Sequence, residues 1–319
     1  MRGQDNLSAK PAKGHKRVAA IQVGSVLFDK QATLDKYETW LVKAAEKNAD
    51  LAVFPEAFIG GYPKGHHFGA PIGSRSEAGR DWFARYFNDA IVVPGPECDH
   101  MAKLSKTYNI DVIVGVIERE GGTLYCSVLC FSRTGALVGK RRKLMPTAAE
   151  RLIWGQGDGS SLTCFETETG RLSGIICWEN FMPALRLTQY DQGVEIYCAP
   201  TVDDRESWGS LMRTIAMEGR CFVVSSHQYF QRKDCPKDFK PMQGDAPDTV
   251  LINGGSMIVS PLGEVVVGPV FGEEGLIMAD IDLAEIARGK YDFDVTGHYG
   301  RSDIFTLNVN RNKHTLISK

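Results

Sequence analysis

The chain has 319 residues, of which 43% are hydrophobic and 24% are charged. These fractions are typical of a soluble globular protein and exclude a disordered or fibrous chain. With 37 Lys and Arg against 39 Asp and Glu, the formal net charge is -2. This balance offers no electrostatic attraction for nucleic acid or for an anionic membrane, so we expect neither as a partner and favour a small neutral ligand.

Residues 1–16 are polar and basic, and no apolar segment with signal-peptide character follows them. We therefore expect a flexible N-terminal arm at 1–16, a single domain at 17–310 and a C-terminal tail at 311–319. No run approaches the roughly 20 apolar residues that cross a bilayer. The eight cysteines lack the dense spacing of a disulfide framework, which indicates reduced thiols and a cytoplasmic protein. Segment 125–131 holds two of them but has the pattern of a buried strand, so we expect no metal and no cofactor.

The first half of the chain alternates apolar runs with helical periodicity. Residues 18–23 form an apolar run, residues 34–45 place apolar side chains at helical spacing, and residues 51–54 form a second run. Strand, helix and strand in this order predict a βαβ unit and an α/β fold. The pattern continues with a helix at 98–108, a strand at 111–117 and a hairpin-like pair at 123–132 and 136–140.

The second half repeats this alternation. A helix marked by Trp208, Met212 and Ile215 is expected to be closed by Gly219, since glycine accepts the left-handed conformation after a helix end. Residues 233–248 lack periodicity and are expected to form a surface loop or an interface insertion. Further strands are expected at 172–177, 194–199, 221–226, 256–260 and 276–281.

Cys177 lies where an apolar strand meets the start of a helix. Gly174-Ile-Ile leads into Cys177-Trp-Glu-Asn, and Pro183 then begins helix-like sequence. Such a turn can expose a nucleophile, and the N–H groups of the helix start favour a thiolate and a developing oxyanion. A strand-end cysteine taken alone is more often an inert core residue, so its neighbours decide its role.

Charged side chains end two other strands. Val53-Phe-Pro-Glu56 ends one with a carboxylate, and Lys143 ends another, shortly before Glu150. Because the ligand crevice of open α/β sheets lies at the carboxyl ends of strands, we expect Glu56 and Cys177 to face one pocket. The rest of the basic run 140–143 is expected to be mostly solvated. The glycine cluster at 154–159 lacks the spacing of a phosphate-binding loop and is expected to shape the site as a tight loop.

Three motifs carry a family resemblance. They are Phe54-Pro-Glu-Ala-Phe-Ile-Gly-Gly-Tyr-Pro63, then Arg142-Lys-Leu-Met-Pro-Thr147 with Glu150-Arg151, and Cys177-Trp-Glu-Asn. In this order they resemble the nitrilase branch of the carbon-nitrogen hydrolase superfamily, and the similarity looks closest to plant-type and yeast-type nitrilases. Two positions depart from the pattern: Arg141 replaces a common His and is expected to alter surface or interface contacts, and Ser302 replaces a common Pro.

The resemblance implies a fold, a set of roles and an activity. It implies a single-domain four-layer αββα sandwich, with Cys177 as nucleophile, Glu56 as general base, Lys143 as oxyanion-stabilising cation and Glu150 as a second, orienting carboxylate. The implied reaction converts an organic nitrile into a carboxylic acid and ammonia through a thioimidate and an acyl thioester, with partial amide product possible. Homodimers, higher homo-oligomers or spiral filaments are also implied.

Pocket walls are harder to assign from sequence. Tyr62, Trp178 and Thr201 follow apparent strand ends, and we expect them to contact substrate. His227 and His298 are expected to be structural, because one follows a buried strand and the other belongs to the C-terminal segment.

Three other functions remain open at this stage. An amidase or carbamoylase could use the same Glu-Lys-Cys set, and a cyanide hydratase would release formamide instead of an acid. A non-catalytic, filament-forming scaffold belongs to a different class, against which the full set of polar site residues argues.

Overall fold

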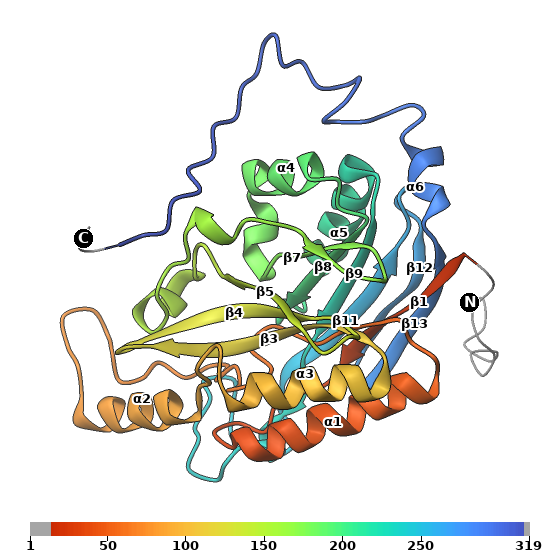
Figure 1. Cartoon of the computed structure of the whole chain (residues 1–319). Coiled ribbons are helices and arrows are strands. Elements are labelled where there is room, and N and C mark those ends of the chain that lie inside the picture. Colours follow the sequence, from red (N-terminus) through yellow and green to blue (C-terminus); the bar gives the residue numbers. More distant parts are fainter. Residues whose placement is uncertain (1–13, 316–319) are drawn as a thin grey trace.

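Two β-sheets face each other in the computed structural model, which describes residues 14–315 (Figure 1). The first sheet contains β1 (His15–Gln22), β2 (Leu51–Val53), β3 (Asp111–Glu120), β4 (Thr123–Phe131), β5 (Leu137–Arg142) and β13 (Gly275–Asp282). Its strand order is β13-β1-β2-β3-β4-β5, and β1, β2 and β3 are parallel.

The second sheet has the same kind of parallel centre. It contains β6 (Phe165–Glu166), β7 (Arg171–Gly174), β8 (Ile196–Thr201), β9 (Phe222–His227), β10 (Tyr229–Gln231), β11 (Val250–Val259) and β12 (Val265–Phe271). The order is β10-β11-β9-β8-β7-β6, with β12 beside β11, and β7, β8 and β9 are parallel.

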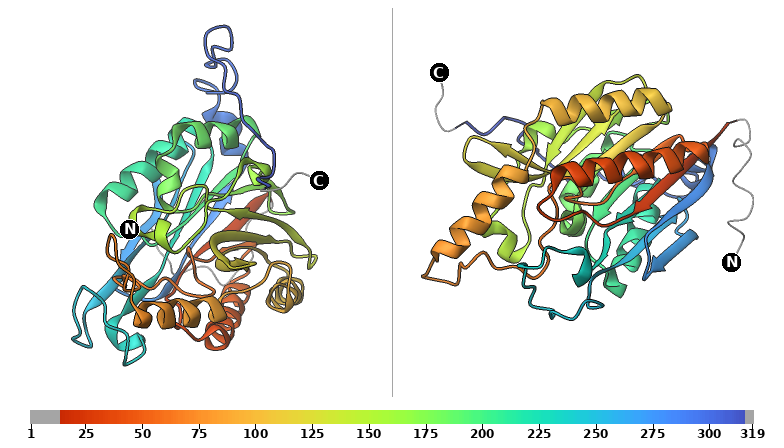
Figure 2. Two further views of the ribbon diagram at one scale, coloured as in Figure 1. Left: turned by 90° about the vertical axis from the view of Figure 1, so that its left-hand side faces the viewer. Right: turned by 90° about the horizontal axis from the view of Figure 1, so that it is seen from below.

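Helices cover the outer faces of both sheets. The helices are α1 (Lys30–Glu46), α2 (Glu77–Asp89), α3 (Pro96–Tyr108), α4 (Pro183–Asp191), α5 (Glu206–Gly219) and α6 (Ala284–Gly289). α1 and α3 lie against the first sheet, and α4 and α5 lie against the second (Figures 1 and 2). The predicted four-layer αββα sandwich is therefore confirmed.

Three apolar layers hold this arrangement together. Val53 and Leu172 belong to the buried cluster between the sheets. Tyr37 of α1 packs with Val112 in a second cluster, and Trp208 of α5 packs with Tyr197 in a third. Each sheet is thus buried on both faces, which explains why its central strands are apolar runs without alternation.

Described residues at both ends of the expected domain contact the rest of the fold. Residues 1–13 of the expected arm lie outside the described residues, but β1 begins at His15, so the end of that arm pairs with β13. Of the expected tail, 316–319 lie outside the described residues. Arg311 donates to the Leu162 carbonyl at 2.8 Å and the N–H of His314 donates to Asp158 Oδ2 at 2.8 Å, so this segment returns to the domain.

The end of α5 is also different from the expectation. The helix runs through Gly219, and Arg220 adopts the left-handed conformation with φ of 45°. A Cβ atom at position 219 would lie 2.4 Å from the Tyr190 ring. Glycine is therefore needed here for the contact between α4 and α5, and not for the left-handed turn.

Two elements were not predicted from the sequence. α2 places Trp82, Phe83, Tyr86 and Phe87 at helical spacing against the core, so its signal was present in the sequence and was missed. β12 is largely exposed, so it has no buried apolar run. The expected loop at 233–248 is confirmed, apart from a short 3-10 turn at Arg232–Asp234. Among the described residues, no helix combines the length and the apolar character that crossing a bilayer would require.

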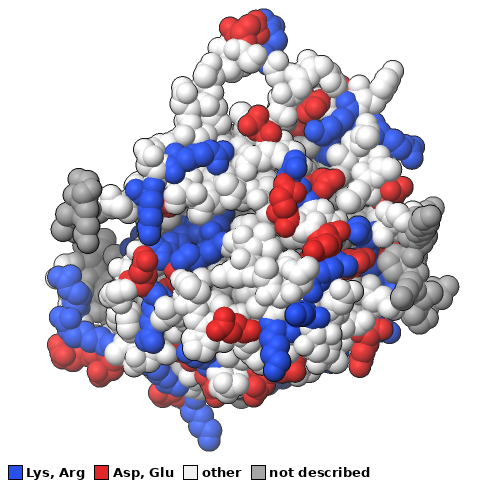
Figure 3. Space-filling view, in the orientation of Figure 1, with Lys and Arg blue, Asp and Glu red and all other residues white. Residues whose placement is uncertain are grey.

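Positive and negative side chains are interspersed over the face shown in Figure 3. This agrees with the near balance of charges in the sequence, and no broad field of one sign covers that face.

Gly115 of β3 sets the path of the chain after β2. Its N–H donates to the Pro55 carbonyl at 3.1 Å, and a Cβ atom at this position would lie 2.3 Å from that carbonyl oxygen and 2.7 Å from Glu56 Cα. The segment that carries Glu56 can therefore lie flat against β3 only because residue 115 has no side chain.

We expect Gly115→Ala to destabilise the fold by about 1 to 3 kcal/mol, because the surrounding backbone must move to admit a methyl group. Gly122→Ala is the matched control, since a Cβ atom there meets nothing within 4 Å, and its effect should stay within about 0.5 kcal/mol. Denaturant unfolding of both variants measures the difference. Equal stabilities would show that this close contact does not constrain the fold.

Candidate active site

Four polar side chains from separate parts of the chain meet at the carboxyl ends of the parallel strands. Glu56 follows β2, Lys143 follows β5, Cys177 follows β7, and Glu150 lies in the 3-10 turn η1 (Ala148–Leu152). Lys143 contacts both carboxylates, and Cys177 is close enough to affect the pKa of Glu56 and Lys143. The predicted convergence of Glu56 and Cys177 is thus observed.

Glu56 is fully buried. Its Oε1 accepts a hydrogen bond from Lys143 Nζ at 2.7 Å, and the Cys126 thiol lies 3.7 Å from the same oxygen. Burial raises the pKa of Glu56, and the charge of Lys143 opposes this effect. Its Oε2 is buried and makes no hydrogen bond to the described chain, so this oxygen is free to accept a proton.

Lys143 joins the two carboxylates. Its ammonium donates to Glu56 Oε1 at 2.7 Å and to Glu150 Oε2 at 2.8 Å, and its side chain is fully buried. Burial lowers the pKa of Lys143, but the negative charges of Glu56 and Glu150 raise it by more, and the net pKa lies well above the ordinary value. The amine therefore stays charged.

Glu150 is held by three donors. Besides Lys143, its Oε2 accepts the backbone N–H of Thr147 at 2.6 Å, and its Oε1 accepts the Tyr62 hydroxyl at 2.7 Å. These bonds fix the carboxylate on the side of Lys143 away from Glu56. The negative charge of Glu150 also raises the pKa of Glu56.

Cys177 occupies a strained turn between β7 and the 3-10 helix η3 (Cys177–Phe181). Its φ is 50°, which is uncommon for a residue other than glycine. Asn180 stabilises the turn, because its Nδ2 donates to the Cys177 carbonyl at 2.7 Å and to the Ile175 carbonyl at 3.0 Å. Burial and the charge of Glu56 raise the pKa of Cys177 well above its ordinary value, so the resting group is the thiol.

The three expected pocket residues have different environments. Tyr62 bonds to Glu150, and Thr201 is buried beside Cys177, where its hydroxyl lowers the pKa of the thiol. The Trp178 ring instead is 40% exposed and its Nε1 donates to Asp203 Oδ2 at 2.8 Å. The Arg205 guanidinium covers the ring at 4.5 Å. Trp178 thus lies outside the cavity that Tyr62 and Glu150 line.

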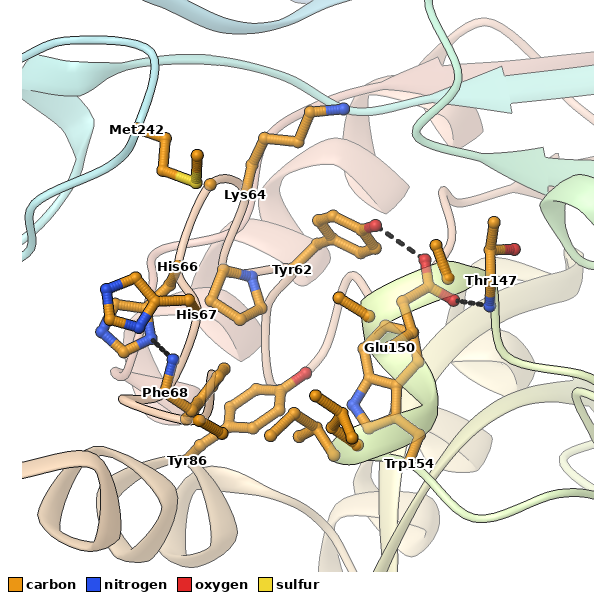
Figure 4. Close-up of a pocket in the computed structure, with 17 residues that line it drawn as sticks. Tyr62, Lys64, His66, His67, Phe68, Tyr86, Thr147, Glu150, Trp154 and Met242 are labelled. Carbon is orange, nitrogen blue, oxygen red and sulfur yellow. Dashed lines mark hydrogen bonds between the residues drawn. The ribbon is translucent and has the colours of Figure 1, made fainter. Parts of the chain in front are cut away.

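A cavity of about 400 Å³ adjoins the four side chains and shares Tyr62 and Glu150 with them. Figure 4 shows the Tyr62 hydroxyl directed at Glu150, with His66 and His67 on one side of the space and Trp154 on the other. Glu56, Lys143 and Cys177 do not line this cavity, which adjoins the buried set through Tyr62 and Glu150. Most of its wall is apolar or aromatic: Phe68, Tyr86, Leu152, Ile153, Trp154 and Met242.

The glycine cluster after Lys143 has the shape that was expected. The N–H of Gly157 donates to the Lys143 carbonyl at 2.8 Å, and a Cβ atom at 157 would lie 2.5 Å from the Arg142 carbonyl oxygen. Gly155 packs closely against Tyr125. The segment is a tight loop that brings Trp154 to the cavity.

The remaining histidines and cysteines lie outside the four-residue set. His227 is buried, its Nε2 lies 3.0 Å from the Asp203 carbonyl oxygen, and burial lowers its pKa to about 4. His298 is exposed. All eight cysteines are free, and within residues 14–315 no group of three or more His, Cys, Asp or Glu side chains has the arrangement of a metal site.

The basic run 140–143 is not solvated, which corrects the prediction. Lys140 and Arg142 pair with Glu118, and Arg142 also pairs with Glu120. Arg141, expected at the surface or an interface, is 1% exposed and pairs with Glu179 through two bonds of 2.6 and 2.9 Å. Their carboxylate partners lie on other strands or turns. The sequence of a basic run therefore does not reveal the acidic residues that it contacts.

Glu179 belongs to the motif Cys177-Trp-Glu-Asn, but the sequence indicated no role for it. Its carboxylate accepts the backbone N–H of Ile176 and of Leu144, next to Cys177 and Lys143 respectively. Gln228 was not singled out either, and its Nε2 donates to the Glu56 carbonyl at 2.8 Å. For Glu179, the one sequence feature that could have indicated a role in the site is its position two residues after Cys177. Gln228 had no such feature.

Known proteins are similar to this chain in sequence and in fold. The Carbon-nitrogen hydrolase family profile matches residues 17–291. The chain is 51% identical to a bifunctional nitrilase/nitrile hydratase of Lupinus angustifolius, over 92% of this chain and 85% of that protein. It is 49% identical to an aliphatic nitrilase of Sinorhizobium fredii, over 94% of this chain and 97% of that protein.

Solved structures show the same fold at lower identity. A CN-hydrolase superfamily protein from Xanthomonas campestris has a TM-score of 0.70 at 19% identity, covering 92% of this chain and 99% of that one. An amidase from Nesterenkonia sp. has a TM-score of 0.66 at 18% identity, covering 88% and 95%. The family profile and the relatives at about half identity place this chain in the carbon-nitrogen hydrolase family, whose members hydrolyse carbon-nitrogen bonds other than peptide bonds.

Proposed function

We propose that the protein is a nitrilase, which converts an organic nitrile and water into a carboxylic acid and ammonia. The observation that carries this proposal is the buried Lys143 ammonium between Glu56 and Glu150, beside the Cys177 thiol. Relatives that are named as nitrilases share 49% to 51% sequence identity with this chain, which favours a nitrile over an amide as substrate.

Cys177 is the nucleophile in this proposal. Glu56 accepts the thiol proton at its free Oε2, sulfur bonds to the nitrile carbon, and the proton passes to nitrogen, which yields a thioimidate. Covalent capture divides one difficult hydrolysis into easier steps. Holding the thiol beside its base also removes much of the entropic cost of the attack.

Two waters complete the reaction. The first, deprotonated by Glu56, adds to the thioimidate carbon while that proton passes to nitrogen. The new hydroxyl then gives its proton through Glu56 to the same nitrogen, which leaves as ammonia as the thioester carbonyl forms. The second hydrolyses the remaining thioester, releasing the acid and restoring the thiol. Lys143 and the N–H groups in the first turn of η3, including that of Trp178, stabilise the negative charge of the tetrahedral centres, an effect worth about 3 to 4 kcal/mol per donor in hydrolases.

A second product is favoured by one comparison. The Lupinus relative is named a bifunctional nitrilase/nitrile hydratase, and an amide forms if the carbon-sulfur bond of the tetrahedral centre breaks before the carbon-nitrogen bond. We therefore include partial amide release in the proposal.

We also propose a cytoplasmic location and a homo-oligomer, a homodimer or a longer spiral filament. The eight free thiols support a reducing compartment. The exposed apolar side chains of Trp178, Phe181 and Met182 lie close together in sequence and support self-association of the surface around η3.

The first experiment incubates the purified protein with a panel of nitriles and amides, and measures ammonia, acid and amide together. We expect acid and ammonia from nitriles, and a loss of at least about three orders of magnitude in Cys177→Ala with its thermal unfolding unchanged. Hydrolysis of amides alone would make the protein an amidase or carbamoylase. Turnover retained by Cys177→Ala would remove the cysteine from the mechanism.

The pH dependence follows from the raised pKa of Glu56. The protonated carboxyl cannot accept the thiol proton, so kcat/KM should rise with pH through a pKa above the ordinary 4.5 for glutamic acid. This apparent value belongs to the coupled set of Glu56, Lys143, Glu150 and Cys177. Rates measured from about pH 4 to about pH 9 test this, with Glu56→Gln expected to be inactive throughout. An acid limb at or below 4.5 would contradict the assignment.

The apolar cavity predicts a preference for a large organic group. Its volume of about 400 Å³ holds a phenyl ring, and each buried methylene contributes about 0.8 kcal/mol. We expect kcat/KM for phenylacetonitrile to exceed that for acetonitrile by at least about tenfold. Ala70→Trp, which fills part of the cavity, should reduce the rate with phenylacetonitrile more than that with acetonitrile. Equal losses for both nitriles would place the organic group elsewhere.

A further inference from the structure

The Glu179 carboxylate is buried and fully bonded. Its Oε1 accepts from Arg141 Nη2 at 2.6 Å and from the Leu144 N–H, and its Oε2 accepts from Arg141 Nη1 at 2.9 Å and from the Ile176 N–H at 3.1 Å. Both side chains of the ion pair are almost inaccessible to solvent. Removing one partner of such a pair leaves an uncompensated charge in the interior.

These bonds connect the two segments that carry the nucleophile and the cation. Ile176 directly precedes Cys177, and Leu144 directly follows Lys143. Arg141 adds a contact of 3.3 Å from Nη1 to the Gly174 carbonyl, at the end of β7. One carboxylate and one guanidinium therefore join the turn after β7 to the segment that follows β5.

The chemistry of this junction requires a carboxylate. Four donors converge on two oxygens, and only an ionised carboxyl offers enough acceptor sites for all of them. A glutamine would keep one oxygen and direct its NH₂ group at a backbone N–H. Lysine in place of Arg141 would retain the charge but lose the two parallel bonds.

We propose that Glu179 and Arg141 are positioning residues, which set the placement of the Cys177 thiol relative to Lys143 and Glu56. The proposal rests on the function given above, because it concerns the same nucleophile. Neither side chain touches the substrate. They act through the backbone of Ile176 and Leu144, where a shift of about 1 Å can reduce a reaction rate a hundredfold.

The test compares Glu179→Gln with the wild type in two assays. One measures kcat and KM for nitrile hydrolysis, and the other measures the rate of alkylation of Cys177 by iodoacetamide, followed by mass spectrometry of the peptide that contains it. We expect kcat and the alkylation rate to fall by about 10- to 100-fold, with KM changed by less than about threefold.

Asp280→Asn is the matched control. Asp280 accepts two bonds from the buried Arg17, at 2.6 and 2.7 Å, at the other end of the first sheet. Loss of this ion pair should lower the melting temperature but leave kcat and the alkylation rate within about twofold of the wild type. A purely structural role for Glu179 would give the same result as this control.

Wild-type kcat and alkylation rates in folded Glu179→Gln would overturn the proposal. If that variant does not fold, Arg141→Lys decides in its place: reduced kcat and alkylation support the proposal, and wild-type values overturn it. The same experiments distinguish failure of the positioning role of Glu179 from failure of the proposed nitrilase function. A wild-type enzyme that releases no ammonia from any nitrile would refute the proposed function, while the alkylation comparison still reports the placement of Cys177.

Discussion

The buried contact of Lys143 with two carboxylates is the interaction on which the site depends. Lys143 Nζ lies 2.7 Å from Glu56 and 2.8 Å from Glu150, so the set carries two negative charges and one positive charge. Loss of the ammonium would leave two like charges facing each other in a medium of low dielectric constant. The remaining negative charge, together with burial, explains why the pKa of Cys177 is raised. A thiolate becomes accessible when its proton moves to Glu56, because that transfer leaves the net charge of the set unchanged.

The parts of this arrangement that the sequence predicted are local patterns. Glu56 and Cys177 come shortly after apolar strands, Lys143 comes directly after β5, and the carboxyl ends of these strands, from two facing sheets, lie at one edge of the sandwich. The order of strands and helices was readable for the same reason, since a strand buried on both faces is an uninterrupted apolar run. The four-layer architecture itself came from the family resemblance, because periodicity alone does not place two sheets face to face.

The parts that the sequence did not predict depend on partners far along the chain. Arg141 looked like a solvated charge because its partner, Glu179, lies 38 positions away in a different turn. The sequence predicted that Gly219 ends the helix. In the structure its small size is needed because the Tyr190 ring packs directly against it. The cavity is built from the segments around Tyr62 and Glu150, with Met242 from the expected loop. No periodicity links such segments, so their meeting is a property of the tertiary structure.

The same electrostatic balance bears on which product the proposed reaction releases. In the tetrahedral centre, nitrogen leaves as neutral ammonia once it is protonated, whereas sulfur leaves as a thiolate. While Glu56 is ionised, its charge and that of Glu150 oppose the thiolate, as the raised pKa of Cys177 indicates. When Glu56 has given its proton to nitrogen, nitrogen can leave as ammonia and the ionised Glu56 opposes release of the thiolate. The carbon-nitrogen bond then breaks, and the acid is released. A Glu56 that keeps the proton opposes the thiolate less and leaves nitrogen a poor leaving group, which favours the amide. In the proposed reaction, the acid-to-amide ratio therefore depends on where one proton resides. The charge of Lys143 lowers the pKa of Glu56 and so favours transfer of that proton to nitrogen.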